Sequence, residues 1–434
     1  MSLTQKTSGT TIKRFIPYLG GILVLVFLTR IAFTNGDFKA LLEAAKLVAA
    51  GKNPYHVWIF VSEGNYDLYF YSPLWAVLLI PFTHLPNFIP NIIWLVANGW
   101  FLCRICILLA KYLEPHTIAG NKLRWILFLS ILLSLRYILY NFEMIQMTIF
   151  LLWGSLESIH LFKKKYFLIG GAILALIINI KILPVVLIPW LIYRREWRGA
   201  VSTLGFSIVF LMLPAVILGW SPNLFLLSEW WSVINPGNAE HLAETDLGLH
   251  SLTALIPTLF TKTEGALPYA RNLFNLDAST TTAILNASRA GLILFTLFFL
   301  RWPPFKQAKS TLHELRELSY ILLLIPLIFP HQQKYAFFLA FPAMFYISGF
   351  IIDNFRPAER KTSNLKYYAV LALFFLSFAL MTLSSDGIIG RQLNLVTQHF
   401  KTITYGAVIL IVILFILPAG LLQTPAQKSK QINT

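Results

Sequence analysis

Charged residues are scarce in this chain. They make up 12% of its 434 residues, against 57% hydrophobic residues and a mean hydropathy of +0.67. Soluble domains carry about 25% charged residues, so this composition excludes an ordinary soluble protein. The many long apolar segments predict an all-α polytopic membrane protein. The first of them has no small-residue cleavage site, and we interpret it as a membrane anchor rather than a signal peptide.

Cysteine is almost absent. The two cysteines, Cys103 and Cys106, lie in one apolar segment. Their CxxC spacing is typical of redox proteins, but no βαβ pattern surrounds it. We therefore interpret both as small residues of the core.

Several familiar motifs are also missing. The sequence has no Gly-rich phosphate loop, no HExxH, no paired CxxC for zinc and no DxD. No segment is long enough for a soluble inner domain, which a nucleotide-sugar enzyme would need. These absences favour a lipid-borne substrate and predict neither a metal nor a cofactor. Repeats, low-complexity tracts and domain linkers are not visible, so residues 1–434 are interpreted as one transmembrane domain.

The net charge of +16 is distributed in small clusters between the apolar segments. This is the positive-inside pattern, which fixes the orientation of the spans. Nucleic-acid binding would need a basic surface with base-reading elements, and none is visible. The clusters are Lys13-Arg14, Lys163-Lys164-Lys165, Arg194-Arg195 with Arg198, Lys306 with Lys309, Arg356 with Arg360-Lys361, and Lys428 with Lys430.

The basic clusters predict about 12 spans with both termini inside. Outer loops are expected at 35–87 and 220–279. The segment Ser72 to Leu85 reaches only about 21 Å against a hydrocarbon core of about 30 Å, so it is expected to be either re-entrant or a short outer-leaflet helix. The spans are expected at 20–33, 88–112, 123–140, 144–162, two short helices between Lys165 and Arg194, 199–219, 280–300, 317–330, 336–352, 367–384 and 403–422.

In this topology almost all polar residues that interrupt apolar sequence lie on the outer side. Ionisable groups at membrane depth are rare and usually functional, so chemistry is expected on this face. The residues are Asp37, Asn141, Glu143, Gln146, Lys181, His250, His331, Lys334 and Arg391.

Asp37 is the strongest candidate among them. It follows the first apolar segment and precedes an amphipathic run that begins at Phe38. Aspartate is a favoured helix N-cap, so Asp37 either caps this helix or acts as a catalytic base. The two roles are compatible.

The other polar groups each have a structural alternative. Lys181, between two short apolar helices, either binds a phosphate or snorkels from a helix end. The turn His331-Gln332-Gln333-Lys334-Tyr335 either binds phosphate or simply joins two helices. Asn141, Glu143 and Gln146 either face a substrate or satisfy interhelical hydrogen bonds.

Two stretches resemble the GT-C glycosyltransferases of family 87. The first consists of NGDF, AAKLVAAGKNPY and YFYSPLWAVLLIPF, which include Tyr55 and Tyr71. The second begins NFEMIQMTIFLLWGSLESI and continues through GGAILALIINIKILPVVLIPWLIYRREWR. The order and spacing of these stretches carry the resemblance, which covers roughly residues 15 to 350.

The resemblance implies a GT-C fold with amphipathic surface helices in the first outer loop. It implies an inverting, metal-independent mannosyltransferase of the inner membrane that uses a polyprenyl-phosphate sugar. The acceptor would be a glycolipid or glycan on the periplasmic face of the cell envelope. The family's catalytic Asp maps onto Asp37, its intramembrane Lys onto Lys181 and a late His onto His331.

We add Lys334 and Arg391 to the predicted cations for donor phosphate. The predicted substrate-binding residues are Tyr55, Tyr71, Asn141, Glu143, Gln146 and His250. The chain departs from the family pattern around Glu143, where Gly-Gln-x-Asn is common, and at His250, where Asn or Gln often precedes the serine. Both departures affect the expected substrate pocket, so sugar and acceptor stay open.

Two other classes of function stay open. A transporter or flippase of a lipid-linked sugar would also be polytopic with outer polar groups. It would be expected to show repeat symmetry and broken helices in both halves. The sequence shows one candidate break, at Lys181. A non-catalytic assembly protein would tolerate the loss of the Asp37 carboxylate.

Overall fold

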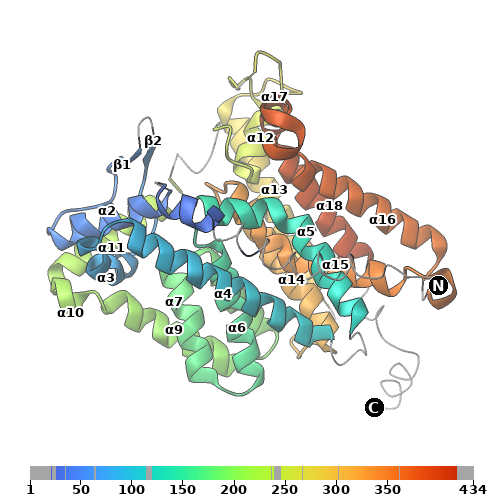
Figure 1. The fold of residues 1–434 in the computed structure, drawn as a ribbon, viewed down its shortest axis with the longest axis horizontal. Coiled ribbons are helices and arrows are strands. Elements are labelled where there is room, and N and C mark those ends of the chain that lie inside the picture. Colours follow the sequence, from blue (N-terminus) through green and yellow to red (C-terminus); the bar gives the residue numbers. More distant parts are fainter. Residues whose placement is uncertain are drawn as a thin grey trace, which may run out of the picture.

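The computed structural model describes residues 21, 26–34, 36–62, 65–113, 120–235, 237–238, 246–265, 267–301, 303–360 and 362–417. Two predicted spans, 20–33 and 403–422, therefore fall partly outside the described residues. Within these ranges the fold is almost entirely helical, which confirms the expected all-α class. Figure 1 shows the arrangement of the helices.

The elements follow in chain order. They are α2 (Phe38–Ala49), β1 (Ile59–Ser62), β2 (Asn65–Asp67), α3 (Pro73–Leu79), η1 (Ile80–His84), α4 (Phe88–Leu113), α5 (Asn121–Glu143), α6 (Thr148–Lys163), α7 (Phe167–Ile180), η3 (Leu183–Val186), α8 (Leu187–Tyr193), α9 (Trp197–Met212), α10 (Ala215–Leu218), α11 (Trp220–Ile234), α12 (Leu252–Phe260), α13 (Ala278–Leu300), α14 (Thr311–Ile328), η5 (Lys334–Ala340), α15 (Phe341–Asp353), η6 (Pro357–Glu359), α16 (Asn364–Phe378), η7 (Ala379–Leu383), α17 (Asp386–His399) and α18 (Thr402–Ile416).

Among the described residues, six helices are long and apolar enough to cross a membrane, or seven if the bent pair α17 and α18 is one span. The expected count of about 12 is not confirmed. The difference arises because several predicted spans are short or broken. For example, α7 has 14 residues, which at about 1.5 Å each cannot cross a core of about 30 Å alone.

The predicted break at Lys181 is confirmed. Helix α7 ends at Ile180, and Lys181 is extended with φ −142° and ψ 119°. The 3₁₀ segment η3 then begins at Leu183, with Pro184 in its first turn. Proline lacks the N–H that would continue the hydrogen bonding of α7, so the chain restarts in a new helix.

A second break lies at the predicted turn around His331. Helix α14 ends at Ile328, and η5 begins at Lys334. The turn between them is tied to the second predicted outer loop, 220–279, because Leu249 and Gln333 form an antiparallel bridge. Backbone that leaves helical structure inside a membrane protein is tolerated only where protein or a polar cavity surrounds it.

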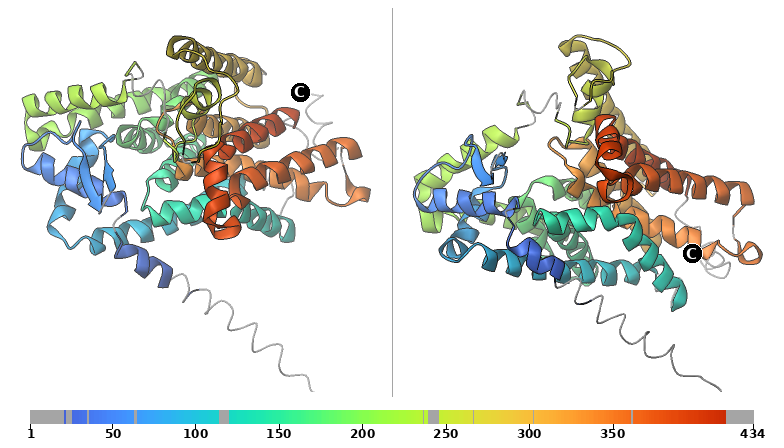
Figure 2. Two further views of the ribbon diagram at one scale, coloured as in Figure 1. Left: turned by 90° about the horizontal axis from the view of Figure 1, so that it is seen from above. Right: turned by 45° about the horizontal axis from the view of Figure 1, so that its top comes forward.

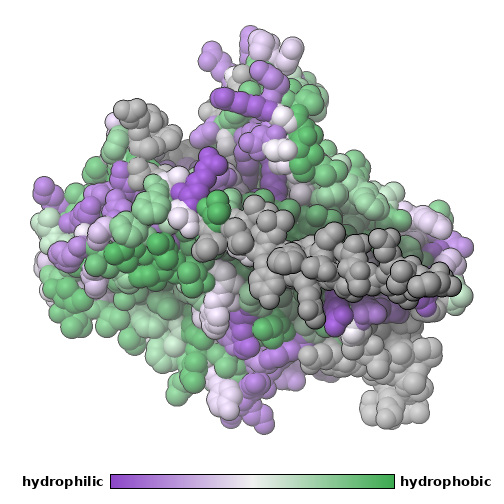
Figure 3. All heavy atoms as spheres, in the orientation of Figure 1, coloured by the Kyte–Doolittle hydropathy of each residue, from purple (hydrophilic) through white to green (hydrophobic). Residues whose placement is uncertain are grey.

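The protein has a buried centre and an apolar outside. Residues 334–353, forming η5 and α15, are almost entirely buried, with α5 and α14 packed around them. By contrast, α9 exposes large apolar side chains such as Val201 and Ile208. Figure 3 shows a wide hydrophobic area on the left of the molecule, with hydrophilic side chains gathered above and below. An exposed apolar surface of this extent is expected for helices in lipid.

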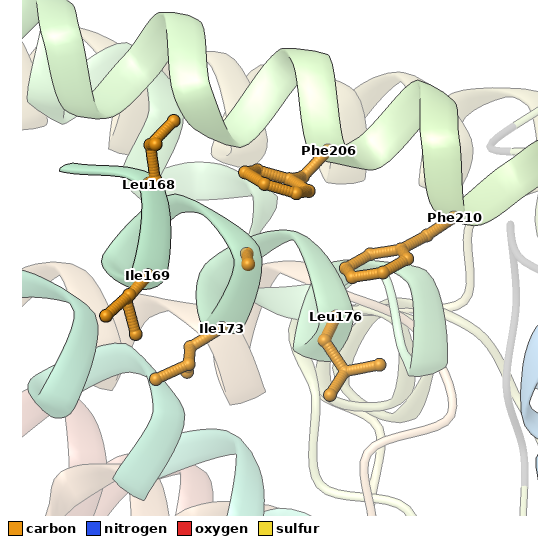
Figure 4. A pocket seen from close by; sticks show the side chains of 7 residues that line it. Leu168, Ile169, Ile173, Leu176, Phe206 and Phe210 are labelled. Atoms are coloured by element: carbon orange, nitrogen blue, oxygen red, sulfur yellow. The ribbon is translucent and has the colours of Figure 1, made fainter.

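A shallow groove of about 320 Å³ lies between α7 and α9. Figure 4 shows its apolar lining, which includes Ile173, Leu176, Phe206 and Phe210. All the side chains that line it are apolar. The groove belongs to the lipid-facing surface and carries no chemistry of its own.

The described part of the first predicted outer loop, 35–87, forms a small layer at one end of the molecule. Helix α2 packs on α3 and η1, and its apolar face, with Leu42, Ala44 and Ala45, is buried. Strands β1 and β2 form an antiparallel hairpin in which Ile59 lies opposite Asp67. The views in Figures 1 and 2 place this layer at the opposite end of the molecule from α16 and α18.

Candidate active site

Asp37 stands directly before α2, but its side chain does not cap the helix. Its backbone is helical, with φ −56° and ψ −23°, and its carboxylate accepts no capping hydrogen bond. The Oδ2 atom instead accepts a hydrogen bond from Nε2 of Gln146, a residue 109 positions away in the chain. The capping interpretation of Asp37 is therefore wrong for this structure, and its carboxylate belongs to a tertiary site.

Gln146 is held firmly in place for this contact. Its backbone carbonyl accepts hydrogen bonds from Nε1 of Trp94 and Nδ2 of Asn98, both at 3.2 Å. Gly36 also lies close to this turn, since a Cβ there would be 2.9 Å from the carbonyl oxygen of Met144. A side chain at position 36 would therefore require the backbone at Gly36 or at Met144 to shift.

A second carboxylate, Asp67, approaches Asp37 from the end of strand β2. Burial, and after it the negative charge of Asp67, raise the pKa of Asp37 to about 7 against the opposing effects of Gln146 and Lys181. Burial also raises the pKa of Asp67. A carboxyl whose pKa lies near 7 is well suited to accept a proton at neutral pH.

Lys181 lies between two tyrosine rings. Its Nζ atom is 5.4 Å from the ring centroid of Tyr71 and 5.4 Å from that of Tyr335. Both rings attract the cation through their π faces. The structure gives Lys181 no hydrogen bond or ion pair with a described side chain, so its ammonium is available to an anion.

Two predicted substrate-binding residues, Tyr55 and Asn141, donate hydrogen bonds to the backbone of these tyrosines. The hydroxyl of Tyr55 donates to the backbone carbonyl of Tyr71 at 2.9 Å. Nδ2 of Asn141 donates to the carbonyls of Tyr335 at 3.0 Å and Tyr137 at 2.8 Å. Tyr55 and Asn141 are buried and position the walls of the site.

His331 and Lys334 border the same region. The His331 ring lies 5.1 Å from the ring of Phe70, and its backbone has a positive φ of 56°. Nζ of Lys334 lies 5.4 Å from the ring centroid of Tyr140, which stacks on Tyr335 at 6.2 Å. The turn at His331 therefore brings Lys334 to a tyrosine ring of the site and His331 to Phe70, the chain neighbour of Tyr71.

Three other predicted residues have different surroundings. His250 is fully buried, and its backbone N–H donates to the carbonyl of Gln332 at 2.9 Å, so it anchors the His331 turn. Glu143 is exposed at the end of α5. Arg391 is exposed on α17, beside the kink at Gly390, and no described contact joins it to Asp37 or Lys181.

The sequence prediction missed Asp67 and did not single out Tyr335. Tyr335 was visible only as the last residue of the polar turn. Asp67 lies in a short strand with no motif around it. Its position near Asp37 depends on the β1–β2 hairpin, which the sequence does not reveal. No group of three or more His, Cys, Asp or Glu side chains suited to a metal ion is found in the part of the chain that the structure describes.

The family model of glycosyltransferase family 87 matches residues 69–330, more than half of the chain. This chain belongs to glycosyltransferase family 87. Neither a curated protein nor a solved structure matches it significantly. The match includes Tyr71, Gln146 and Lys181, whereas Asp37 and His331 lie outside it. Its apolar helices and family membership together make the chain a membrane-embedded glycosyltransferase.

Proposed function

We propose that this family 87 glycosyltransferase moves mannose from a polyprenyl-phosphate sugar to a hydroxyl of a glycolipid or glycan acceptor on the outer face of the inner membrane. One observation supports this proposal above the others. The carboxylate of Asp37, which makes no capping hydrogen bond, and the ammonium of Lys181, which forms no ion pair with a described side chain, belong to one site with interacting charges. The choice of mannose and of the polyprenyl carrier rests on the resemblance described above.

The proposed mechanism is a single inverting displacement. Asp37 accepts the proton of the acceptor hydroxyl, and the oxygen attacks the anomeric carbon of the donor in line. The bond between that carbon and the phosphate oxygen breaks, and both its electrons leave with the polyprenyl phosphate. Lys181 stabilises the negative charge on the departing phosphate, with Lys334 and His331 nearby. Phosphate is a good leaving group, so no general acid is required.

The donor prediction can be tested in purified membranes. Transfer from radiolabelled polyprenyl-phosphate mannose to membrane acceptors should continue in excess EDTA, because Lys181 takes the place of a divalent cation at the donor phosphate. Label in the extracted acceptor is the measurement. Activity that disappears with EDTA and returns with Mn²⁺ would contradict the proposal. So would direct use of GDP-mannose after synthesis of the lipid-linked donor is blocked.

The pH dependence of transfer should report the charge of Asp37. Only the ionised carboxylate accepts a proton, so kcat/KM should fall about tenfold per pH unit below an apparent pKa of about 7 and level off above it. Asp67→Asn removes a negative charge that raises this pKa, so the acidic limb should move to lower pH. The measurement is kcat/KM from pH 5 to 9.

The exposed carboxylate of Glu264, in the other outer segment, offers a matched control. Glu264→Gln removes the same charge without touching Asp37 and should leave the limb in place. If Asp67→Asn gives the wild-type profile, the two carboxylates do not interact as described.

A further inference from the structure

A groove of about 460 Å³ follows the polar face of α2 in the first outer segment. Helix α2 forms one side, and residues just before and within strand β1 form the other. The lining includes three lysines, one glutamate and two aromatic residues: Lys39, Glu43, Lys46, Lys52, Trp58 and Phe60. None of these residues has a role in the displacement mechanism.

The groove faces water rather than lipid. The opposite face of α2, with Ala44 and Ala45 fully buried, packs on α3 and η1. Lys39, Glu43 and Lys46 are three or four residues apart, so they lie on one polar face of α2. This face points away from α3 and η1. A molecule in this groove must therefore be polar and reach it from the outer aqueous side.

The aromatic side chains of the groove are available for contact. Trp58 is 66% exposed and Phe60 is 48% exposed. Exposed tryptophan beside polar groups is typical of binding surfaces, because its ring offers a large rigid face at low entropic cost. A sugar ring presents a flat C–H face that fits such a surface.

The charge of the groove is positive. Lys46 pairs with Glu43 at 2.7 Å, and Nζ of Lys39 donates to the carbonyl of Val61 at 2.8 Å while lying 5.0 Å from the Phe60 ring. Lys52 is exposed at the far end of the groove. Three ammonium groups face a single carboxylate, so an acidic ligand is favoured.

The groove is built from the two elements that flank the carboxylates of the site, α2 and the β1–β2 hairpin. Lys39 is two residues after Asp37, and β1 pairs with β2, which ends at Asp67. Helix α2 extends about 15 Å from Lys39 to its end at Ala49, and Lys52 lies in the turn that follows. A saccharide chain lying in the groove is therefore held by the same segment that carries Asp37 and Asp67.

We propose that this groove binds the saccharide chain of an acidic glycan acceptor, with a sugar ring stacked on Trp58 and an acidic substituent contacting Lys46 and Lys52. This inference rests on the proposed function, because it assigns the bound chain as the acceptor. The acceptor substrate is then an anionic saccharide of several units.

Saturation-transfer NMR on the purified full-length protein in detergent tests the binding, with mannotetraose and mannotetraose 6-phosphate as probes. The phosphorylated chain should bind at least about fivefold more tightly than the neutral one. Trp58→Ala should weaken binding of both probes about tenfold, and Trp58→Phe should restore part of it. The double variant Lys46→Ala and Lys52→Ala should remove the preference for the phosphorylated chain.

Matched controls are available elsewhere in the chain. Trp125 is 60% exposed on α5, and Lys262 is exposed in the second outer segment. Trp125→Ala and Lys262→Ala should leave both affinities unchanged. Absence of binding to the wild-type protein would overturn the inference, as would equal losses from Trp58→Ala and Trp125→Ala.

Transfer assays separate this inference from the proposed function. Trp58→Ala should raise the acceptor KM about tenfold while kcat and the donor KM stay unchanged. Asp37→Asn should bind the saccharides like the wild type and lose transfer. If Asp37→Asn loses transfer but Trp58→Ala keeps the wild-type acceptor KM, only the groove assignment fails. If Asp37→Asn transfers normally, the proposed mechanism fails, and the NMR result alone decides whether the groove binds saccharide.

Discussion

Replacing Asp37 with asparagine should lower mannose transfer by about 10²–10⁴-fold, the usual contribution of a positioned general base. Asparagine has nearly the shape of aspartate, and its amide oxygen still accepts the hydrogen bond from Gln146. It cannot take a proton from the acceptor hydroxyl. The measurement is single-turnover transfer from labelled polyprenyl-phosphate mannose by the purified variant, with donor binding measured separately and expected to persist.

This substitution also separates catalysis from a structural role. Asparagine caps helices as well as aspartate does, so a carboxylate that only began α2 would be replaced almost silently. Gln146→Ala serves as a companion variant, because it frees the Asp37 carboxylate while keeping its charge. It should cost less than Asp37→Asn. Near-normal transfer by a folded Asp37→Asn protein would end the mechanism proposed here.

The sequence predicted those features that depend on local patterns. A lysine and a proline between apolar runs predicted the helix break at Lys181, and the structure confirms it. A polar run between two apolar segments predicted the turn at His331, where α14 gives way to η5. In both places a few adjacent residues cannot continue an apolar helix, so their types alone determine the break.

The number of spans could not be predicted in the same way. Hydropathy reports how apolar a segment is, but not whether its helix stays straight. Helices α17 and α18 meet at 72°, and α7 with the η3–α8 segment forms a broken pair. Their path is set by packing, such as that of α7 against α6 and α9. Two short helices that each cross the membrane and one helix broken in the middle have the same hydropathy pattern, so the sequence does not distinguish them.

The composition of the site was only partly predictable for a related reason. Asp37 and Lys181 interrupt apolar surroundings, which marks them in the sequence. Asp67 lies in a polar hairpin, where one more carboxylate gives no signal. Its approach to Asp37 follows from the pairing of β1 with β2. Arg391 interrupts an apolar region as well, but the kink at Gly390 leaves it exposed on α17.

Replacing Lys181 with alanine should lower kcat/KM by about 10²–10³-fold, the range found when one group that stabilises a developing negative charge is removed. The ammonium lies between the rings of Tyr71 and Tyr335 and forms no ion pair with a carboxylate of the described residues, so we expect a donor phosphate as its partner. Because the donor already carries charge before reaction, donor affinity and turnover should both fall. Steady-state kinetics with the labelled donor measure the two effects.

The variant Lys181→Arg distinguishes charge from shape at this position. A guanidinium keeps the positive charge but is planar and larger, so it should recover only part of the activity between the two tyrosine rings. Lys262→Ala, which removes an exposed lysine far from the break in sequence, should behave like the wild type. A snorkelling lysine would contact only water and headgroups, and its loss would leave kcat/KM unchanged. An unchanged kcat/KM for Lys181→Ala would show that Lys181 does not bind the donor phosphate. The proposed mechanism would then lack a cation opposite Asp37.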